Sequence, residues 1–232
     1  MTSRHLAWAA GALAALATSF AARPADACTT KGSGHYYEIQ YDITNDADHG
    51  ASVAISTKHL TDATPSSSFV DHEMWYGVNA SGSYWVEVGV TDGETFSGSA
   101  VNQHIFWADN RANGGGYHEH YPNVSWKIGP YYEARVEWAG NNSWNVYFGG
   151  VHLGTSTKNF YGGTTRALEA GIEAVTAHAG DKVDGYMNNP KRKDANNVWY
   201  SGWQSPGIIQ DCPGAIRRID SLTLHEVLHG PA

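Results

Sequence analysis

The chain has 232 residues, a formal net charge of −8 and only 15 lysine and arginine residues. This charge balance argues against nucleic acid as a partner, because phosphate binding depends on clustered basic side chains. Nine tryptophans, 13 tyrosines and 26 glycines are typical of an all-β protein with many turns and aromatic strands.

The start of the chain has the pattern of a secretion signal. An apolar stretch over residues 6–22 follows a short basic start, and residues 25–27 read A-D-A, a small-residue cleavage pattern. We therefore expect a signal peptide over residues 1–27 and a single domain over residues 28–232. No later stretch is apolar enough to span a membrane, so we expect a secreted protein that is not bound to one.

The chain has two cysteines, Cys28 and Cys212. In an oxidising compartment, an even number of cysteines in a secreted domain predicts a disulfide. A bridge between Cys28 and Cys212 would close almost the whole mature chain into one loop. It would stabilise the fold by about 4 kcal/mol, because the unfolded state would lose entropy.

Most of the mature chain alternates between apolar and polar residues, with short polar or glycine-rich turns between the runs. In chain order, the strand-like runs cover residues 35–43, 51–55, 75–78, 84–90, 103–109, 124–128, 131–138, 144–148, 151–153 and 198–203. The polar loops cover residues 61–68, 111–120 and 188–197. Strands that recur about every 8–12 residues, with turn signals between them, predict a sandwich or a barrel.

Residues 165–178 are compatible with two structures. Their composition suits a helix, whereas the alternation of Leu168, Ala170 and Ile172 with other residues suits a strand. The all-β context and Gly171 favour the strand.

A β-hairpin is predicted over residues 75–90, where two aromatic runs flank a polar turn at residues 79–83. In the second run, Trp85, Glu87 and Gly89 share one face of the strand. A plain surface strand would prefer a threonine or lysine at the central position. Glu87 is therefore a candidate catalytic group, although an outward glutamate on a half-exposed strand is the simpler interpretation.

The order of several motifs resembles the eqolisin family of glutamic peptidases. That family has, in order, a W-x-G-x-D run, a Q-x-G-V run, an acidic aromatic strand, a turn with glycine, and a segment with E-x-x-x-E spacing. The matching runs here are W-Y-G-V-N at 75–79, E-V-G-V at 87–90, F-W-A-D at 106–109, G-P-Y at 129–131 and L-E-A-G-I-E at 168–173. The resemblance covers about residues 70–205. The chain resembles the neprosins, another glutamic peptidase family, less.

This resemblance implies a concanavalin A-like double-sheet β-sandwich, a jelly roll, and peptide hydrolysis without a cofactor. Glu169 would be the base that activates water. Glu87 stands where the family has a glutamine that stabilises the oxyanion, and a carboxyl group can donate there only when it is protonated. Two close carboxyl groups can share a proton, so that one is neutral and one charged. The side chains expected to line the substrate cleft are Trp75, Asn79, Trp85, Trp107, Asp109 and Glu173.

Two histidine motifs suggest other chemistry. H-E-V-L-H at residues 225–229 matches a zinc-peptidase pattern, in which a helix places His225 and His229 on one face. Pro231 leaves little room for a supporting helix, so we treat both as weak metal candidates and expect no metal. His118 and His120 would share a face of an extended segment and could contact metal or substrate, although a solvated loop is the simpler interpretation.

The sequence thus predicts a secreted, monomeric acid endopeptidase of the glutamic type, or a catalytically altered relative. One alternative is a non-catalytic, lectin-like module that binds polysaccharide through exposed aromatic rings. A second alternative is a zinc peptidase built on the H-E-V-L-H motif. The glutamic peptidase requires Glu87 and Glu169 to face each other across one cleft, whereas the lectin-like module does not.

Overall fold

A computed structural model describes residues 35–42, 48–79, 83–111, 115–157, 168–175, 180–203, 207–210, 214–218 and 223–229. Within these ranges the chain forms strands, turns and loops and no helix. It follows that none of the described segments is a helix able to cross a membrane. The predicted signal peptide, Cys28 and Cys212 lie outside the described residues.

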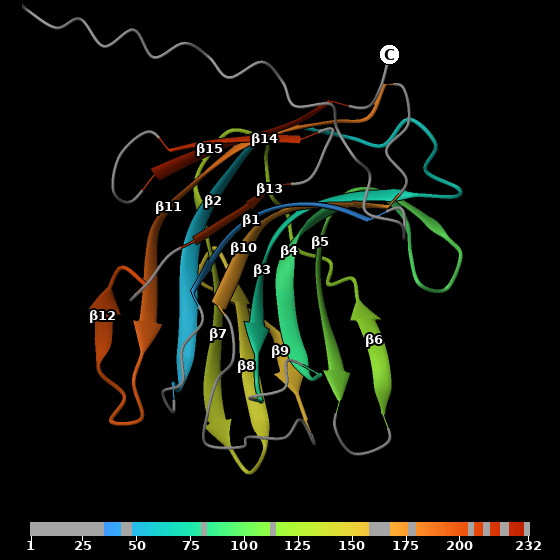
Figure 1. Ribbon diagram of the computed structural model, residues 1–232. Coiled ribbons are helices and arrows are strands. Elements are labelled where there is room, and N and C mark those ends of the chain that lie inside the picture. Colours follow the sequence, from blue (N-terminus) through green and yellow to red (C-terminus); the bar gives the residue numbers. More distant parts are fainter. Residues whose placement is uncertain are drawn as a thin grey trace, which may run out of the picture.

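The strands form two sheets, and their pairings are antiparallel (Figure 1). Sheet A has seven strands, in the order β13 (Gly207–Gln210), β1 (His35–Asp42), β10 (Leu168–Val175), β3 (Phe69–Gly77), β4 (Trp85–Glu94), β5 (Ala100–Arg111) and β6 (Gly116–His120). Sheet B has the order β14 (Gly214–Arg218), β15 (Thr223–His229), β11 (Lys182–Lys193), β2 (Gly50–Thr61), β7 (Tyr132–Gly140), β8 (Ser143–Phe148) and β9 (Val151–Ser156), with β12 (Trp199–Ser201) paired to β11.

The hydrophobic core lies between the two sheets. Sheet A contributes alternate residues such as Met74, Val88 and Ile172, and sheet B contributes residues such as Val136 and Val146, all of them fully buried. Because successive side chains of a strand point to opposite faces, the residues between them point to the outer face of each sheet. The fold is an all-β double-sheet sandwich of the concanavalin A-like type, which confirms the predicted fold class.

The boundaries of several strands differ from the prediction. Residues 168–175 form strand β10, which confirms the strand interpretation. Residues 124–128 lie outside the strands, where a short strand was predicted. The predicted loops at 111–120 and 188–197 contain β6 and the end of β11, respectively. Pairing with β5 and β2 holds these polar residues in the sheets, a tertiary effect that the local sequence does not reveal.

A buried polar pair joins the two sheets inside the core. His72 Nε2 lies 2.9 Å from Glu226 Oε2, and His72 Nδ1 lies 2.9 Å from the Thr57 hydroxyl. Gly185 leaves room for the imidazole, since a Cβ atom there would lie 2.6 Å from His72 Cε1. Burial lowers the pKa of His72 to about 4 and raises the pKa of Glu226 well above its ordinary value. The pair is therefore neutral, and the Glu226 carboxyl group donates to the imidazole.

Candidate active site

A row of paired residues crosses the outer face of sheet A. In strand order the row is Glu169 of β10, Trp75 of β3, Glu87 of β4, Ala108 of β5 and Glu119 of β6. Directly paired residues in antiparallel strands have their side chains on the same face. Glu87 and Glu169 therefore share one face, as the peptidase prediction requires. Their strands are not neighbours, because β3 lies between them, and two strand spacings put their Cα atoms about 10 Å apart.

Glu87 is held on this face as a buried acid, with 6% of its surface exposed. Its Oε2 accepts a hydrogen bond of 2.8 Å from the Trp85 indole, and its Oε1 lies 2.9 Å from the Tyr117 hydroxyl. Burial, followed by the negative charge of Glu173, raises the pKa of Glu87 to about 8, although the contacts with Tyr117 and Trp85 oppose the rise. Glu87 is therefore a neutral carboxylic acid at and below neutral pH.

The hydroxyl of Tyr117 lies between two carboxyl groups, at 2.9 Å from Glu87 Oε1 and 3.0 Å from Glu119 Oε1. A phenol has one hydrogen and cannot donate to both. Glu119 Oε2 also accepts hydrogen bonds of 2.7 Å from the Tyr121 hydroxyl and from the Phe96 backbone N–H.

One assignment of hydrogens satisfies all of these contacts. Protonated Glu87 donates to the oxygen of Tyr117, and Tyr117 donates to Glu119. Burial and the nearby carboxylates raise the pKa of Tyr117 above its ordinary value, so its hydroxyl keeps its hydrogen. The hydrogen-bond geometry thus calls for a proton on one of the two carboxyl groups, and the raised pKa of Glu87 places it there.

Two further carboxyl groups, Glu73 and Asp71, lie deeper on the same face, 1% and 6% exposed. Burial is the main cause that raises the pKa of both well above the ordinary value, and neighbouring carboxylates add to it. Glu73 Oε2 and Asp71 Oδ1 are buried without a hydrogen-bond partner. A buried oxygen without a donor is tolerated far better in a neutral carboxyl group than in a charged one, so burial favours the protonated form of both groups.

Glu73 occupies a groove between the glycines paired with it, Gly89 and Gly171. A Cβ atom at Gly89 would lie 2.4 Å from Glu73 Cβ and 2.4 Å from the His72 carbonyl oxygen.

Gly89→Ala is therefore expected to destabilise the fold by about 3 kcal/mol, because the backbones of β3 and β4 must separate. Urea unfolding at pH 5 measures this loss. Gly98→Ala is the control, since its nearest neighbour is 3.8 Å away and only a positive φ of 81° opposes the side chain. That strain costs about 1 kcal/mol. Equal losses in the two variants would contradict the close approach at Gly89.

Three of the predicted substrate-binding residues lie on the same face as Glu87. Trp75 is paired with both Glu169 and Glu87 and lies between their strands. Trp85 is half-buried and donates its indole hydrogen to Glu87. Glu173, paired with Asp71, is the neighbouring carboxylate that raises the pKa of Glu87 most.

Two of the other three, Trp107 and Asp109, do not join this face. Trp107 is 4% exposed and stacks on His120 at 3.8 Å between ring centroids. Asp109 is fully buried and accepts a hydrogen bond of 2.7 Å from Arg111 Nε. Both flank Ala108, which shares the face of Glu87, so the alternation of β5 turns them to the inner side. Asn79 accepts the Tyr84 backbone N–H at 3.1 Å and so closes the hairpin.

The H-E-V-L-H motif lies in strand β15 and not in a helix. Residues four apart in a strand are about 13 Å apart, so His225 and His229 do not share a helical turn. His225 Nε2 lies 2.9 Å from Asp184 Oδ1, and the neighbouring Glu226 points into the core. The zinc-peptidase arrangement is therefore not formed, because pairing with β11 and β14 draws the segment into sheet B. The part of the chain that the structure describes contains no group of three or more His, Cys, Asp or Glu residues that could hold a metal ion.

The sequence analysis missed four residues of this face, namely Asp71, Glu73, Tyr117 and Glu119. A signal for them exists. Residues 71–75 read D-x-E-x-W, and residues 117–121 read Y-x-E-x-Y, and each places acids and aromatics at alternate positions of one strand face. The first stands directly before the aromatic run at residues 75–78, and the second lies within the predicted loop at residues 111–120.

No family model matches the chain, and no curated protein matches it in sequence. Among solved structures, scytalidoglutamic peptidase with a transition-state analogue inhibitor is similar, with a TM-score of 0.49 and 10% identity over 86% of this chain and 100% of that chain. SCP-B, an eqolisin peptidase in a complex with a tripeptide, has a TM-score of 0.45 and 8% identity over 86% and 100%. A pentraxin from Limulus polyphemus has a TM-score of 0.39 and 10% identity over 80% and 94%. Similarities of this size concern the fold alone.

Proposed function

We propose that the protein is a secreted endopeptidase of the glutamic type, with its active site on the outer face of sheet A. The observation that carries the proposal is the state of Glu87, a buried and neutral carboxylic acid on the same face as Glu169. A neutral carboxyl group can donate to the oxyanion that forms when water attacks a peptide carbonyl, whereas a carboxylate would repel it. Protonated Glu87 can thus stabilise the oxyanion, the role of the glutamine at this place in the eqolisin motif.

Glu169 supplies the base in this proposal. It is half-buried, so water reaches it, and Trp75 separates its strand position from that of Glu87. A peptide that lies over Trp75 would meet the base on one side and the oxyanion donor on the other. Water activated by Glu169 would attack the carbonyl carbon. The one hydrogen of Glu87, which points to Tyr117 in the free protein, would turn to the developing oxyanion and stabilise it. The order of the sequence motifs favours a peptide over another hydrolysable bond.

The geometry also sets the expected pH range. Catalysis needs Glu87 protonated and Glu169 ionised at the same time. Because the pKa of Glu87 is about 8, its acid form persists into the neutral range. Activity is therefore expected from acid to about neutral pH, a wider window than the acid range that the sequence alone predicts.

The test is digestion of a complex peptide mixture by the mature protein at pH values from 3 to 9, with products identified by mass spectrometry. We expect cleavage that falls away near pH 8 and that a chelator does not reduce. Protein with Glu169→Gln, purified in the same way, controls for contaminating peptidases. If no peptide is cleaved at any pH, the endopeptidase proposal fails and the lectin-like alternative becomes the better account.

A further inference from the structure

A second polar surface lies on the outer face of sheet B, on the other side of the molecule's core from Glu87. A hollow of about 340 Å³ is present there, and its lining residues are Glu133, Arg135, Lys191, Trp199, Tyr200 and Ser201. This volume is at the lower end of the range for small-molecule sites, about 300–1,000 Å³. The hollow has no part in the proposed peptidase site.

The floor of the hollow is made of small residues. Ser52 of β2 is paired with Lys191 on one side and with Arg135 on the other, and Ala54 is paired with Glu133. Long side chains on β7 and β11 therefore flank short ones on β2. The short side chains on β2 therefore form the floor of a depression, and the long side chains on β7 and β11 form its sides.

The charged groups around the hollow are close to one another without being fully paired. Glu133 lies 3.5 Å from Arg135 Nη1 and 3.9 Å from Lys191 Nζ, while Glu137 lies 3.8 Å from both Arg135 Nε and Lys193 Nζ. These separations exceed the usual length of a hydrogen bond. Arg135 Nε is buried and has no hydrogen-bond partner. The cluster has more N–H donors than acceptors, so it favours a ligand that is rich in oxygen acceptors.

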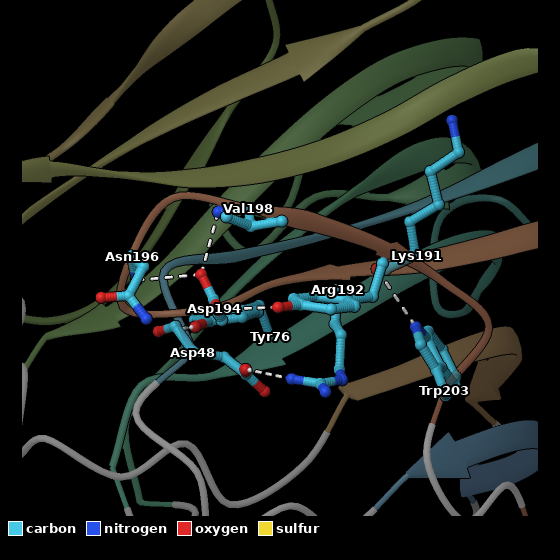
Figure 2. A network of polar contacts seen from close by, with 9 residues as sticks. Asp48, Tyr76, Lys191, Arg192, Asp194, Asn196, Val198 and Trp203 are labelled. Carbon is cyan, nitrogen blue, oxygen red and sulfur yellow. Dashed lines mark hydrogen bonds and ion pairs between the residues drawn. The ribbon is translucent and has the colours of Figure 1, made fainter.

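One aromatic ring borders the hollow. Trp199 of β12 is paired with Lys193, whose Nζ lies 5.7 Å from the centre of the indole ring. Tyr200, the next residue, points to the other face of the hairpin, where the Arg192 guanidinium lies 4.8 Å from the centre of its ring. The β11–β12 hairpin that carries them is held in place by its turn, where Asp194 Oδ1 accepts the backbone N–H groups of Asn196 and Val198 at 2.9 Å (Figure 2).

Strand β11, which pairs with β12, sends its basic side chains to opposite faces. Arg192 turns away and contacts Asp48 Oδ1 at 3.2 Å, whereas the side chain of Lys191 extends in the opposite direction (Figure 2). The backbone of Lys191 is fixed, because its carbonyl oxygen accepts the Trp203 indole hydrogen at 3.3 Å. Lys191 is therefore presented to the hollow by a backbone that is already in place, which lowers the entropy cost of binding.

We propose that this hollow binds an acidic sugar, a uronic acid residue of a polysaccharide, with its ring against Trp199 and its carboxylate and hydroxyl oxygens on Arg135 and Lys191. Three features favour this ligand class. The half-buried indole ring of Trp199 fits the apolar face of a sugar ring. The guanidinium of Arg135 can bind a carboxylate with two parallel hydrogen bonds. The lining has one acidic and two basic side chains, so it carries a net positive charge in a protein whose overall charge is −8.

The test is isothermal titration calorimetry of the full mature chain at pH 6 with trigalacturonate, and with the neutral sugar maltotriose in parallel. We expect saturable binding of the acidic sugar only, and weaker binding as salt is raised from 50 to 500 mM. Sodium acetate at the same carboxylate concentration should not compete, which separates a sugar site from a simple anion site.

Two variants place the binding in this hollow. Lys191→Gln removes one charged donor and should weaken binding about tenfold. Trp199→Ala, on the short edge strand, should do so by a similar factor. Lys182→Gln is the matched control, since it changes a half-buried lysine at the other end of the same strand and should bind as the unaltered protein does.

The inference is overturned if trigalacturonate does not bind, if maltotriose binds equally well, or if the Lys191 and Lys182 variants behave alike. Lys191→Gln should leave peptide hydrolysis unchanged, and Glu87→Gln should leave sugar binding unchanged. The inference therefore stands or falls independently of the peptidase proposal.

Discussion

Replacing Glu169 by glutamine is expected to lower the rate of peptide hydrolysis by about 10²–10⁴-fold, the usual contribution of a general base. Glutamine has nearly the same size and keeps polar contacts, but its amide cannot take a proton from the attacking water. The measurement is kcat/KM at the pH of highest activity, on one peptide taken from the mixture digest. A melting temperature close to that of the unaltered protein will show that the variant is folded.

The partner variant, Glu87→Gln, is expected to behave in the opposite way. An amide donates a hydrogen bond without needing a bound proton, so activity should be kept, and its decline near pH 8 should disappear. The local contacts allow this exchange, because the amide oxygen can accept from Trp85 and the NH₂ group can donate to Tyr117. Glu87→Ala removes the donor altogether and should cost about 2.7–4 kcal/mol of transition-state stabilisation.

Glu94→Gln is the matched control for both variants, since Glu94 is half-buried at the end of the same strand as Glu87. It should leave the rate and its pH profile unaltered. A Glu169→Gln variant with full activity would exclude Glu169 as the base. Glu173, on the same strand and face, would then be the next residue to test, because its charge acts directly on Glu87.

The fold class was predictable from the sequence, because the alternation of runs such as 84–90 and 144–148 reports buried and exposed faces directly. The position of Glu87 beside Trp85 and Gly89 was predictable for the same reason. The pairing of Glu169 with Trp75 was not, since it joins residues far apart in the chain and depends on which strands are neighbours. Only the resemblance to the eqolisin motif order indicated that Glu169 and Glu87 belong to one site.

Other parts of the site depend on tertiary structure that no local pattern reports. Residues 116–120 are polar and follow a glycine-rich segment, so they read as a loop until β5 pairs with them. Only that pairing brings Tyr117 and Glu119 to Glu87. The H-E-V-L-H motif was misleading for the same reason. Its spacing brings the two histidines together only on a helix, and pairing with β11 makes this segment a strand.

The buried ionisable groups differ in how they couple stability to pH. His72 and Glu226 form a neutral pair when folded and bind one proton between them. Between about pH 4.5 and 6.5 the unfolded chain also binds one proton on this pair, now on the histidine, so the pair contributes no slope there. Above that range the folded pair keeps a proton that the unfolded pair has released, so its contribution to stability falls as pH rises.

The free energy of unfolding is therefore expected to be highest near pH 4.5 and to fall as pH rises to 8. Glu87 sets this window, because its pKa rises from 4.5 to about 8 on folding. Below pH 4.5 both states are protonated and its contribution is fully present. Between pH 4.5 and 8 the unfolded state loses its proton while the folded state keeps it, which costs up to about 5 kcal/mol. Asp71 and Glu73 act in the same direction.

Urea unfolding followed by circular dichroism at pH 4.5, 6 and 8 measures this change. Glu87→Gln should make the fall shallower by removing one titrating group, while Glu94→Gln should leave it as it is. If Glu87→Gln and the unaltered protein show the same change in the free energy of unfolding between pH 4.5 and 8, Glu87 is ionised in the folded state. It could then not donate to an oxyanion, and the proposed peptidase mechanism would be refuted without a single activity measurement.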